Sequence, residues 1–557
     1  MKGSNIVKIG AIAVFVLGFI MAGILLTQNW GKSSNILSHE AAMRKLDNLY
    51  SRLVINRLTP KQDPDYQGYD ESAERFSVLP DISEYPFIVN PTTDDFLTIY
   101  SSTEKADWLV DVANRFNQSG PTVDGRSVSV GIRAIPSGLG ADFISSGKYT
   151  PDVYAPSSGV YGDMLAAHGI GTNLVEGRIA GNVGGVVITK TKRDDLSKKY
   201  GDLDSAAVIE SVLASQLALG YTSPLSNEDG FNFILTLLAH FDGNNPTSAE
   251  AVTGLRKFQD KILFISYDSD QLKAALTGGT LDAIVMNHQA YAGSPSLRSS
   301  YEFIPIGVRQ DNPIYEVGDL SPIKKQITAA FVDFCKSAES QGSASDRGFN
   351  AFDSYPGAET INGAAVLRAQ EIYKKEKGGT SDLTAIFVAD ISGSMEGSPL
   401  LNLKASLHRA VGVIDSNANI GLITFSDTVN IAVPIARFDN AQRAYFGNAI
   451  RSMNAGGGTA MFDAIVVAQK MLTDAKERNP NTRLMLFVLT DGESNRGYSF
   501  EDIEGMTAGL RIPVYTIGYN ANIDILQKLS DINEAATMNA DSDNIIYRIE
   551  SLFNSQF

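Results

Sequence analysis

The 557-residue chain has one cysteine, Cys335, and only five histidines. A single cysteine excludes an internal disulfide framework, a cysteine-based zinc site and an iron–sulfur cluster. The histidines are scattered and none is paired with another at helical ligand spacing, which argues against a histidine-based metal site. Metal chemistry in this chain would therefore depend on oxygen ligands.

Basic residues are also scarce, with 47 Lys and Arg against 63 Asp and Glu and a formal net charge of −16. Such a chain repels the phosphate backbone of nucleic acids at long range, so no nucleic-acid partner is predicted. The hydrophobic fraction of 43% is typical of folded proteins. The length predicts two to four folded domains.

Long hydrophobic runs are absent except at 9–26, where eighteen uncharged and mostly apolar residues follow Lys2 and Lys8. That length lies at the lower edge for a membrane-spanning helix. No small-x-small cleavage site follows, which favours an uncleaved anchor over a signal peptide. We assign 1–30 to a cytoplasmic tail and single transmembrane anchor, with the bulk of the chain extracytoplasmic. The positive charges flanking the run are nearly balanced, so a cytoplasmic C-terminal domain stays an alternative.

The segment after the anchor, 31–89, is interpreted as a stalk or helical linker. It begins with an apolar helical stripe and continues, over 59–86, with four prolines among polar residues. The remaining boundaries are a middle domain at 90–375, a linker at 376–382 and a C-terminal domain at 383–557.

The C-terminal domain alternates buried strands with helix-length segments. Short apolar runs at 383–389, 420–425, 484–489 and 512–517 are typical of a parallel sheet covered on both faces. The predicted fold is therefore α/β, doubly wound and mostly parallel. Ligands of such sheets bind beyond the carboxyl ends of the strands.

Oxygen-bearing side chains follow two of these strands and a glycine run. Asp390, Ser392 and Ser394 follow the first strand, with Gly393 allowing an unusual backbone angle; Thr459 follows three glycines, and Asp491 ends the third strand. Two carboxylates and three hydroxyls form a hard-oxygen site that suits Mg²⁺ best, with Mn²⁺ or Ca²⁺ possible. The alternative is that Asp390 and the serines only cap a helix and close a turn.

These five residues match the pattern of the metal-ion-dependent adhesion site of the von Willebrand factor A domain, which the chain resembles over about 383–557. The resemblance implies that a carboxylate from a protein partner completes the metal's coordination. It also implies that a C-terminal helix, here at 543–555, can shift on engagement. No nucleophile motif surrounds the serines, and His408 is on a predicted helix, so no enzymatic activity is predicted.

The middle domain repeats a layout in which serines follow strands and precede helices. Serines beside free backbone N–H groups would make a neutral pocket for an anion or a carboxylate. The alternative is that each serine only caps its helix, in a lobe pair used for protein contacts. The candidate ligand-binding residues are Ser101, Ser102, Ser137, Ser157, Ser223 and Asn287.

From 94 to 375, the order of elements resembles the two-lobed periplasmic-type solute-binding proteins, which close around a ligand by a hinge motion. The expected function is a membrane-anchored binding protein that engages a protein partner through Mg²⁺, with a middle domain for solute sensing or protein docking. Two alternatives stay open: a solute receptor for transport or signalling whose metal domain recruits a partner chain, and a chaperone-like assembly factor. A metal-assisted hydrolase is disfavoured because no general base accompanies the metal loops.

Overall fold

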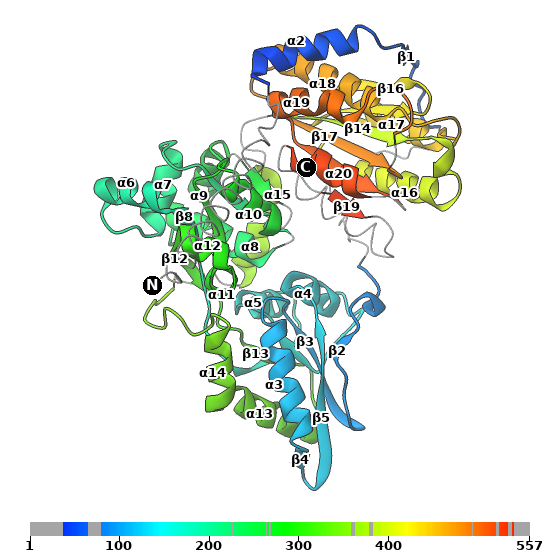
Figure 1. The fold of residues 1–557 in the computed structure, drawn as a ribbon. Coiled ribbons are helices and arrows are strands. Elements are labelled where there is room, and N and C mark those ends of the chain that lie inside the picture. The colour runs from blue at the N-terminus through cyan, green and yellow to red at the C-terminus, as the bar shows by residue number, and fades with distance from the viewer. Residues whose placement is uncertain are drawn as a thin grey trace, which may run out of the picture.

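The computed structural model describes residues 37–64, 79–225, 227–262, 264–266, 269–357, 363–377, 382–492, 494–519, 523–532 and 537–539 (Figure 1). Helices alternate with strands, and the strands form three sheets. The predicted α/β class is confirmed. One sheet belongs to a C-terminal unit, and the other two form the lobes of a middle unit.

The C-terminal sheet has seven strands in the order β1-β16-β15-β14-β17-β18-β19. All neighbouring pairs are parallel except β15 and β16, which form an antiparallel pair. The four strands predicted from apolar runs are present within two residues of their expected ends. The strands are β1 (Ile55–Arg57), β14 (Leu383–Asp390), β15 (Asn419–Phe425), β16 (Val429–Arg437), β17 (Arg483–Thr490), β18 (Val514–Gly518) and β19 (Thr537–Asn539).

Helices cover both faces of this sheet, as a doubly wound fold requires. Successive residues of β14 point to opposite faces, so Phe387 joins one hydrophobic core with α16 and α17. Its neighbours Ile386 and Val388 join a second core with α18 and α19. The helices are α16 (Ser398–Val413), α17 (Asn440–Arg451), α18 (Met461–Arg478), α19 (Phe500–Leu510) and α20 (Ile523–Asp531), with the short 3₁₀ helix η2 (Gly393–Met395) after β14.

The first part of the expected stalk instead belongs to the C-terminal unit. Helix α2 (His39–Tyr50) packs on α18 and α19 (Figure 1) and buries Ala42, Leu46 and Leu49 in their core. Strand β1 then pairs in parallel with β16 at the sheet edge. The apolar stripe of the sequence is therefore covered by a unit that begins more than 300 residues later. Figure 1 shows α2 lying along the top of that unit.

The second part of the expected stalk joins the first lobe of the middle unit, whose sheet has the order β2-β5-β3-β6-β13-β7 with β4 paired to β5. Strand β2 extends this sheet by pairing with β5. The elements are η1 (Ile82–Glu84), β2 (Phe87–Val89), β3 (Asp95–Ser101), α3 (Ala106–Gln118), β4 (Thr122–Val123), β5 (Arg126–Ala134), α4 (Ser137–Ser145), β6 (Val153–Ala155), α5 (Val160–Ala167), β7 (Thr172–Glu176), β13 (Ile314–Val317), α13 (Pro322–Cys335) and α14 (Ala338–Asp346).

The second lobe has the sheet order β10-β9-β11-β8-β12. In each lobe, the strand that follows a crossing from the other lobe runs antiparallel to its neighbours: β8 in the second lobe and β13 in the first. The elements are β8 (Val183–Thr189), α6 (Lys190–Tyr200), α7 (Ser205–Leu213), β9 (Leu219–Thr222), α8 (Glu228–Phe241), α9 (Ala249–Gln259), β10 (Phe264–Ser266), α10 (Ser269–Thr277), β11 (Ala283–Asn287), α11 (His288–Ala292), α12 (Pro295–Ser300) and β12 (Tyr301–Arg309).

The two lobes share a hydrophobic core. Tyr161 of α5 in the first lobe packs on Phe231 of α8 in the second, with ring centroids 6.2 Å apart. Helix α15 (Gly363–Glu376) packs against α5 as well as α8 and α9, and buries Val366 and Tyr373 in the same core. The lobes are therefore joined by apolar packing in addition to the two crossings of the chain.

In the described ranges, no helix is long and apolar enough to cross a membrane. The apolar run at 9–26, on which the predicted anchor rests, lies outside those ranges, as does the predicted helix at 543–555. The membrane anchor and its orientation stay predictions.

Candidate functional site

In the sheet of the C-terminal unit, β14 and β17 end side by side, and the loops that follow them therefore begin next to each other. In the parallel register of β14 and β17, Ala389 faces Leu489, so Asp390 and Thr490 end their strands side by side. The Thr490 hydroxyl donates a hydrogen bond of 2.6 Å to Asp390 Oδ2. Asp491 is the next residue along, and it is half-buried. The two predicted carboxylates thus come from neighbouring strand ends.

Asp390 is fully buried and closes the first turn, because its Oδ1 accepts a 2.7 Å hydrogen bond from the backbone N–H of Ser392. Burial raises the pKa of Asp390 to about 6; the hydrogen bonds from Thr490 and Ser392 oppose this rise, and the charge of Asp491 adds to it. A buried carboxylate beside a second carboxylate favours the binding of a cation, which would neutralise the charge of both.

The two serines lie on the same turn with their hydroxyl oxygens 3.1 Å apart. Ser392 is buried, whereas Ser394 is exposed. Ser392 occupies the N-cap position of η2, yet its side chain makes no capping hydrogen bond. The alternative that the serines merely cap a helix therefore has no support at Ser392, although Asp390 does close a turn.

The glycine loop that carries Thr459 is bonded to this turn through the backbone. The N–H of Gly393 donates to Gly457 O at 3.0 Å, and the N–H of Gly456 donates to Ile391 O at 2.9 Å. The unusual backbone angle expected at Gly393 occurs instead at Gly457, where φ is +83° and an added Cβ would lie 2.4 Å from Asp427 Oδ2. Gly457 thus permits close approach of the glycine loop to the turn between β15 and β16, which carries Asp427.

Thr459 is also bonded to the loop that follows Asp491. Its N–H donates to Asn495 Oδ1 at 2.9 Å, and its carbonyl oxygen accepts from Ser494 Oγ at 2.9 Å. Sequence reasoning missed Asn495 and Ser494, because their role is to position a backbone rather than to supply a ligand. All five predicted residues lie on three loops that are hydrogen-bonded to one another.

The donor set fits a hard divalent cation, because it combines two carboxylates with three hydroxyls. Within the described ranges, no group of three or more His, Cys, Asp or Glu side chains is arranged to hold a metal. A cation at the loops would therefore depend on the hydroxyls of Ser392, Ser394 and Thr459 as well as on the two acids.

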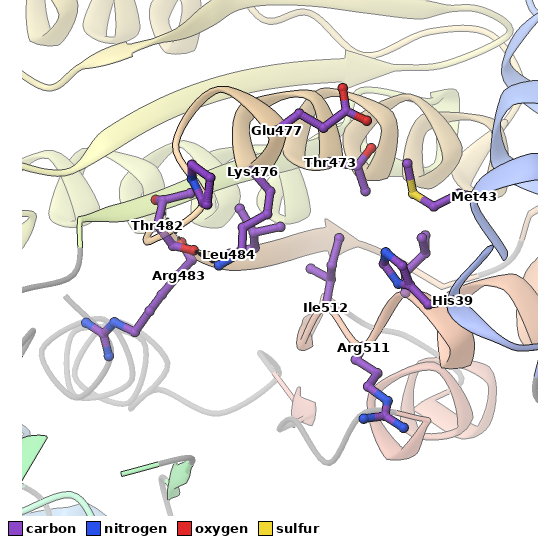
Figure 2. A pocket seen from close by; sticks show the side chains of 12 residues that line it. His39, Met43, Thr473, Lys476, Glu477, Thr482, Arg483, Leu484, Arg511 and Ile512 are labelled. Carbon is purple, nitrogen blue, oxygen red and sulfur yellow. Dashed lines mark hydrogen bonds between the residues drawn. The ribbon is translucent and has the colours of Figure 1, made fainter. Parts of the chain in front are cut away.

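A cavity of about 450 Å³ lies in the same unit but at the amino-terminal ends of β17 and β18, away from these loops (Figure 2). Helix α2 supplies part of its wall through His39 and Met43. Figure 2 shows the side chain of Arg483 pointing away from the other lining residues. This cavity contains none of the predicted site residues.

In the middle unit, one of the predicted serines of the first lobe, Ser102, contacts a buried lysine that the sequence analysis missed. Lys105 Nζ donates to Ser102 Oγ at 2.8 Å and to the carbonyl oxygens of Ala155 and Pro156 at 2.6 and 3.0 Å. Ser137 accepts a 3.2 Å hydrogen bond at Oγ from the N–H of Ser157. The side chains of Ser101, Ser102, Ser137 and Ser157 are all buried.

These serines do not cap the helices that follow them. The N-cap residues of α3, α4 and α5 are Lys105, Pro136 and Gly159, and none of the three makes a side-chain capping hydrogen bond. The helix-capping alternative is therefore wrong for the first lobe, because none of these four serines caps the helix that follows it.

The two candidates of the second lobe have local structural roles. Asn287 is the N-cap of α11 and accepts a hydrogen bond from the N–H of Ala290 at 3.0 Å. Its amide also donates to Asp229, which accepts from Gln310 Nε2 at 2.8 Å. Ser223 Oγ accepts a 3.4 Å hydrogen bond from the N–H of Leu225.

Titratable side chains that the sequence analysis missed accompany the serines of the expected neutral pocket. Burial raises the pKa of Glu228 well above its usual value, and the charge of Glu104 adds to the rise, while Ser137 and Lys105 oppose it. The pKa values of Glu104 and Asp229 are also raised, mainly by burial. Burial lowers the pKa of Lys105 to about 8. In sequence, Glu228 and Asp229 look like ordinary acids of a helix first turn.

Several buried polar atoms around this cluster have no hydrogen-bond partner. They include one carboxylate oxygen each of Glu104 and Glu228 and both amide atoms of Asn232. Buried polar groups in folded proteins are nearly always satisfied, so such a concentration indicates a place for a ligand or for water. The hydroxyl oxygens of Ser157 and Ser158 are also unpartnered.

Comparison with known proteins supports both units. Residues 385–554 match the family model of the von Willebrand factor type A domain, and residues 97–350 match that of the bacterial extracellular solute-binding protein. The predicted combination of the two domain types is confirmed. The completeness of the metal site and the membrane anchor stay predictions.

Individual relatives match only part of the chain. Inter-alpha-trypsin inhibitor heavy chain H3 of Mesocricetus auratus is 28% identical over 154 residues, which cover 25% of this chain and 17% of that protein. Uncharacterized protein sll0103 of Synechocystis is 25% identical over 152 residues, covering 27% and 35%. The chain thus spans about a sixth to a third of the length of these relatives. Among solved structures, the sulfate-binding protein SubI of Mycobacterium tuberculosis H37Rv is 14% identical, with a TM-score of 0.34 and coverage of 51% of this chain and 91% of that chain.

Proposed function

We propose that the protein is a membrane-anchored, extracytoplasmic binding protein whose C-terminal loops hold Mg²⁺ and engage a carboxylate of a protein partner. The observation that carries the proposal is the hydrogen bonding among three loops, which brings two acids and three hydroxyls to one edge of the sheet. No catalytic role is part of the proposal, and Mn²⁺ or Ca²⁺ would satisfy the same donors.

Each residue has a distinct part in this proposal. Asp390 and Asp491 would supply the two negative charges that balance a divalent cation. Ser392 and Ser394 would supply hydroxyl oxygens from one turn, and Thr459 would supply a third from the glycine loop. Because Ser394 is exposed while Asp390 and Ser392 are buried, the partner would approach from the side of Ser394. The cation would act as an electrostatic bridge between the buried acids and the incoming carboxylate.

The position of α2 limits how far the C-terminal unit can lie from the proposed membrane anchor. Leu37 donates a backbone hydrogen bond to Gly505 O of the C-terminal unit at 3.2 Å. Only ten residues, 27–36, lie between Leu37 and the end of the apolar run at residue 26, and these eleven steps along the chain can span at most about 40 Å when fully extended. An anchor at 9–26 would therefore hold the C-terminal unit close to the membrane surface. Protease accessibility of the chain in intact cells tests the orientation: complete protection from external protease would support the cytoplasmic alternative.

The test of the adhesion site is capture of partners by the full chain from solubilised membranes, in Mg²⁺ and in chelator. The N-terminal segment must be retained, because α2 covers part of the core of the C-terminal unit. Asp390→Ala is expected to abolish the capture that Mg²⁺ supports. Asp415→Ala removes an acid at the opposite end of β15 and serves as the matched control, since its carboxylate accepts a hydrogen bond from the N–H of Asn417 in a turn away from the metal loops. Capture that persists in chelator would refute the proposal.

A second candidate function is solute reception by the middle unit, with the C-terminal loops recruiting another chain. It is favoured by the unpartnered polar atoms of Ser157 and Ser158 in the first lobe and of Asn232 in the second. Calorimetric titration of the full chain with anions, amino acids, sugars and metals tests it. Saturable binding that survives Asp390→Ala would support this function, whereas no heat from any class would count against it.

A further inference from the structure

A carboxylate of the second lobe occupies the place where an anion would be expected in the first. Glu228 is the first residue of α8, and its Oε1 accepts a 3.0 Å hydrogen bond from the backbone N–H of Ser137, the first residue of α4. The two residues are 91 positions apart in the sequence and belong to different lobes. Glu228 is only 4% exposed, so this contact is sealed from solvent.

The surroundings of this carboxylate are those of an anion-binding cradle, which we define as Ser137, Ser157, Ser158 and Lys105. The hydroxyls of Ser157 and Ser158 are buried and unpartnered, and Lys105 carries the nearby positive charge. Helices α4 and α5 begin at the cradle without side-chain caps, so their first-turn N–H groups and dipoles favour negative charge there. A carboxylate or a small oxyanion is the group that such an arrangement binds.

The contact does not require that Glu228 be ionised. Burial and the neighbouring Glu104 favour its neutral form, while Lys105 and Ser137 favour the charged form. A carboxyl group in either form keeps an oxygen that can accept the Ser137 N–H. The bridge between the lobes therefore persists when the proton is gained or lost.

The apolar packing around the cradle also holds the lobes together without a solute. Tyr161, three residues after Ser158 of the cradle, packs on Phe231, which is three residues after Glu228 in α8. Helix α15 packs on helices of both lobes. A receptor that closes around a free anion would instead leave this position for the ligand and would need lobes that can separate.

We infer that Glu228 is an internal ligand of the anion-binding cradle. Its carboxyl group takes the place of a free anion and holds the two lobes of the middle unit closed. The middle unit is then a preassembled platform for protein contacts and not a receptor for small oxyanions. The inference uses no part of the metal-dependent loops, so its failure and the failure of the adhesion proposal are separate results.

The test uses the full chain with Glu228→Ala, Glu228→Gln and, as matched control, Glu250→Ala, which removes an exposed acid from the first turn of α9. Acetate is the probe, because it restores the missing carboxylate, and chloride at equal ionic strength is the reference. Acetate is expected to raise the Tm of Glu228→Ala by a few degrees and to leave the wild-type chain and Glu250→Ala unchanged. Glu228→Gln keeps an acceptor for the Ser137 N–H and is expected to show no acetate effect.

Hydrogen exchange of the peptide that begins at Ser137 is a second readout that does not depend on overall stability. Its first amides are expected to exchange at least tenfold faster in Glu228→Ala than in the wild type, and acetate is expected to restore their protection. Three results would overturn the inference: no acetate effect on Glu228→Ala in either readout, binding of acetate or sulfate to the wild type as tight as to Glu228→Ala, or saturable stabilisation of the wild type by ethylammonium, which would indicate a cation site.

Discussion

The two oxygen-rich regions of this molecule have similar ingredients and opposite electrostatic balance. Both lie at the ends of strands in α/β units, and both combine serine hydroxyls with buried acids. At the C-terminal loops, the charge that raises the pKa of Asp390 is a second acid, Asp491. At the cradle, a buried lysine and an acid from the other lobe meet the hydroxyls. The charged groups of the C-terminal loops are both acids, so a bound cation is needed to neutralise them. In the cradle, the positive charge of Lys105 and the carboxyl group of Glu228 both come from the chain itself.

The largest expected effect is on Mg²⁺ affinity, which should depend on the C-terminal loops and not on the cradle. Asp390→Ala should lower the Mg²⁺ affinity of the full chain at least about 100-fold, because it removes one of two charges, and even outer-shell changes typically cost 10- to 100-fold. Isothermal titration calorimetry measures it, with Glu228→Ala expected to keep wild-type affinity. Equal Mg²⁺ affinity in the wild type and Asp390→Ala would break the comparison.

The next effect tests whether the regions belong to separately folded units. Leu46 of α2 is fully buried in the C-terminal unit, so Leu46→Ala should cost about 2–5 kcal/mol of unfolding free energy there. Differential scanning calorimetry should show one transition lowered and the transition of the middle unit unchanged. Val54→Ala is the control, because Val54 is 77% exposed. If both transitions move with Leu46→Ala, the units unfold together.

A smaller effect compares one hydroxyl from each region. Ser394→Ala should weaken Mg²⁺ binding roughly tenfold, because a neutral oxygen ligand is lost while both charges stay. Ser157→Ala should leave Mg²⁺ binding unchanged, and it should not lower stability, because the hydroxyl it removes is buried without a partner. Calorimetric titration and thermal unfolding of both variants provide the measurements. A weaker Mg²⁺ affinity in Ser157→Ala would show that Mg²⁺ binds in the middle unit and would contradict the metal site proposed at the C-terminal loops.

The smallest effect is a pH dependence expected of the cradle region. The raised pKa values of Glu104, Glu228 and Asp229 mean that the folded state binds more protons than the unfolded state as pH rises above the ordinary carboxyl range. The free energy of unfolding of the middle unit should therefore fall as pH rises from about 4.5. The pKa of Lys105, lowered from 10.5 to about 8, acts oppositely: the folded state binds fewer protons between these values, so stability should recover there.

Denaturant unfolding across this pH range measures both limbs. Glu228→Gln removes one of the three acids and should flatten the falling limb, while the recovery attributed to Lys105 should remain. An unchanged falling limb in Glu228→Gln would show that Glu228 does not titrate within the transition and would weaken the electrostatic contrast between the two regions.

The sequence predicted best where a pattern is both strong and local. The apolar run at 383–389 became β14, because a strand buried on both faces must be apolar throughout. Strands β1 and β16 were not predicted, because neither shows a continuous apolar run: β1 is a three-residue edge strand, and β16 is interrupted by Asn430 and Pro434. The stripe of α2 was recognised as helical, but the unit that covers it is encoded hundreds of residues later, and nothing local indicates which surface that will be.

The amino-acid sequence by itself determined the two α/β units and the five oxygen-bearing residues of the C-terminal loops, because strand periodicity and turn residues act over a few positions. Only the tertiary structure decided that Thr459 and Asp390 share one network, that α2 belongs to the C-terminal unit, and that Glu228 meets Ser137 across the lobes. These are contacts between residues far apart in the chain. They form because burying apolar faces brings the helix and strand ends together, and no short-range pattern encodes that outcome.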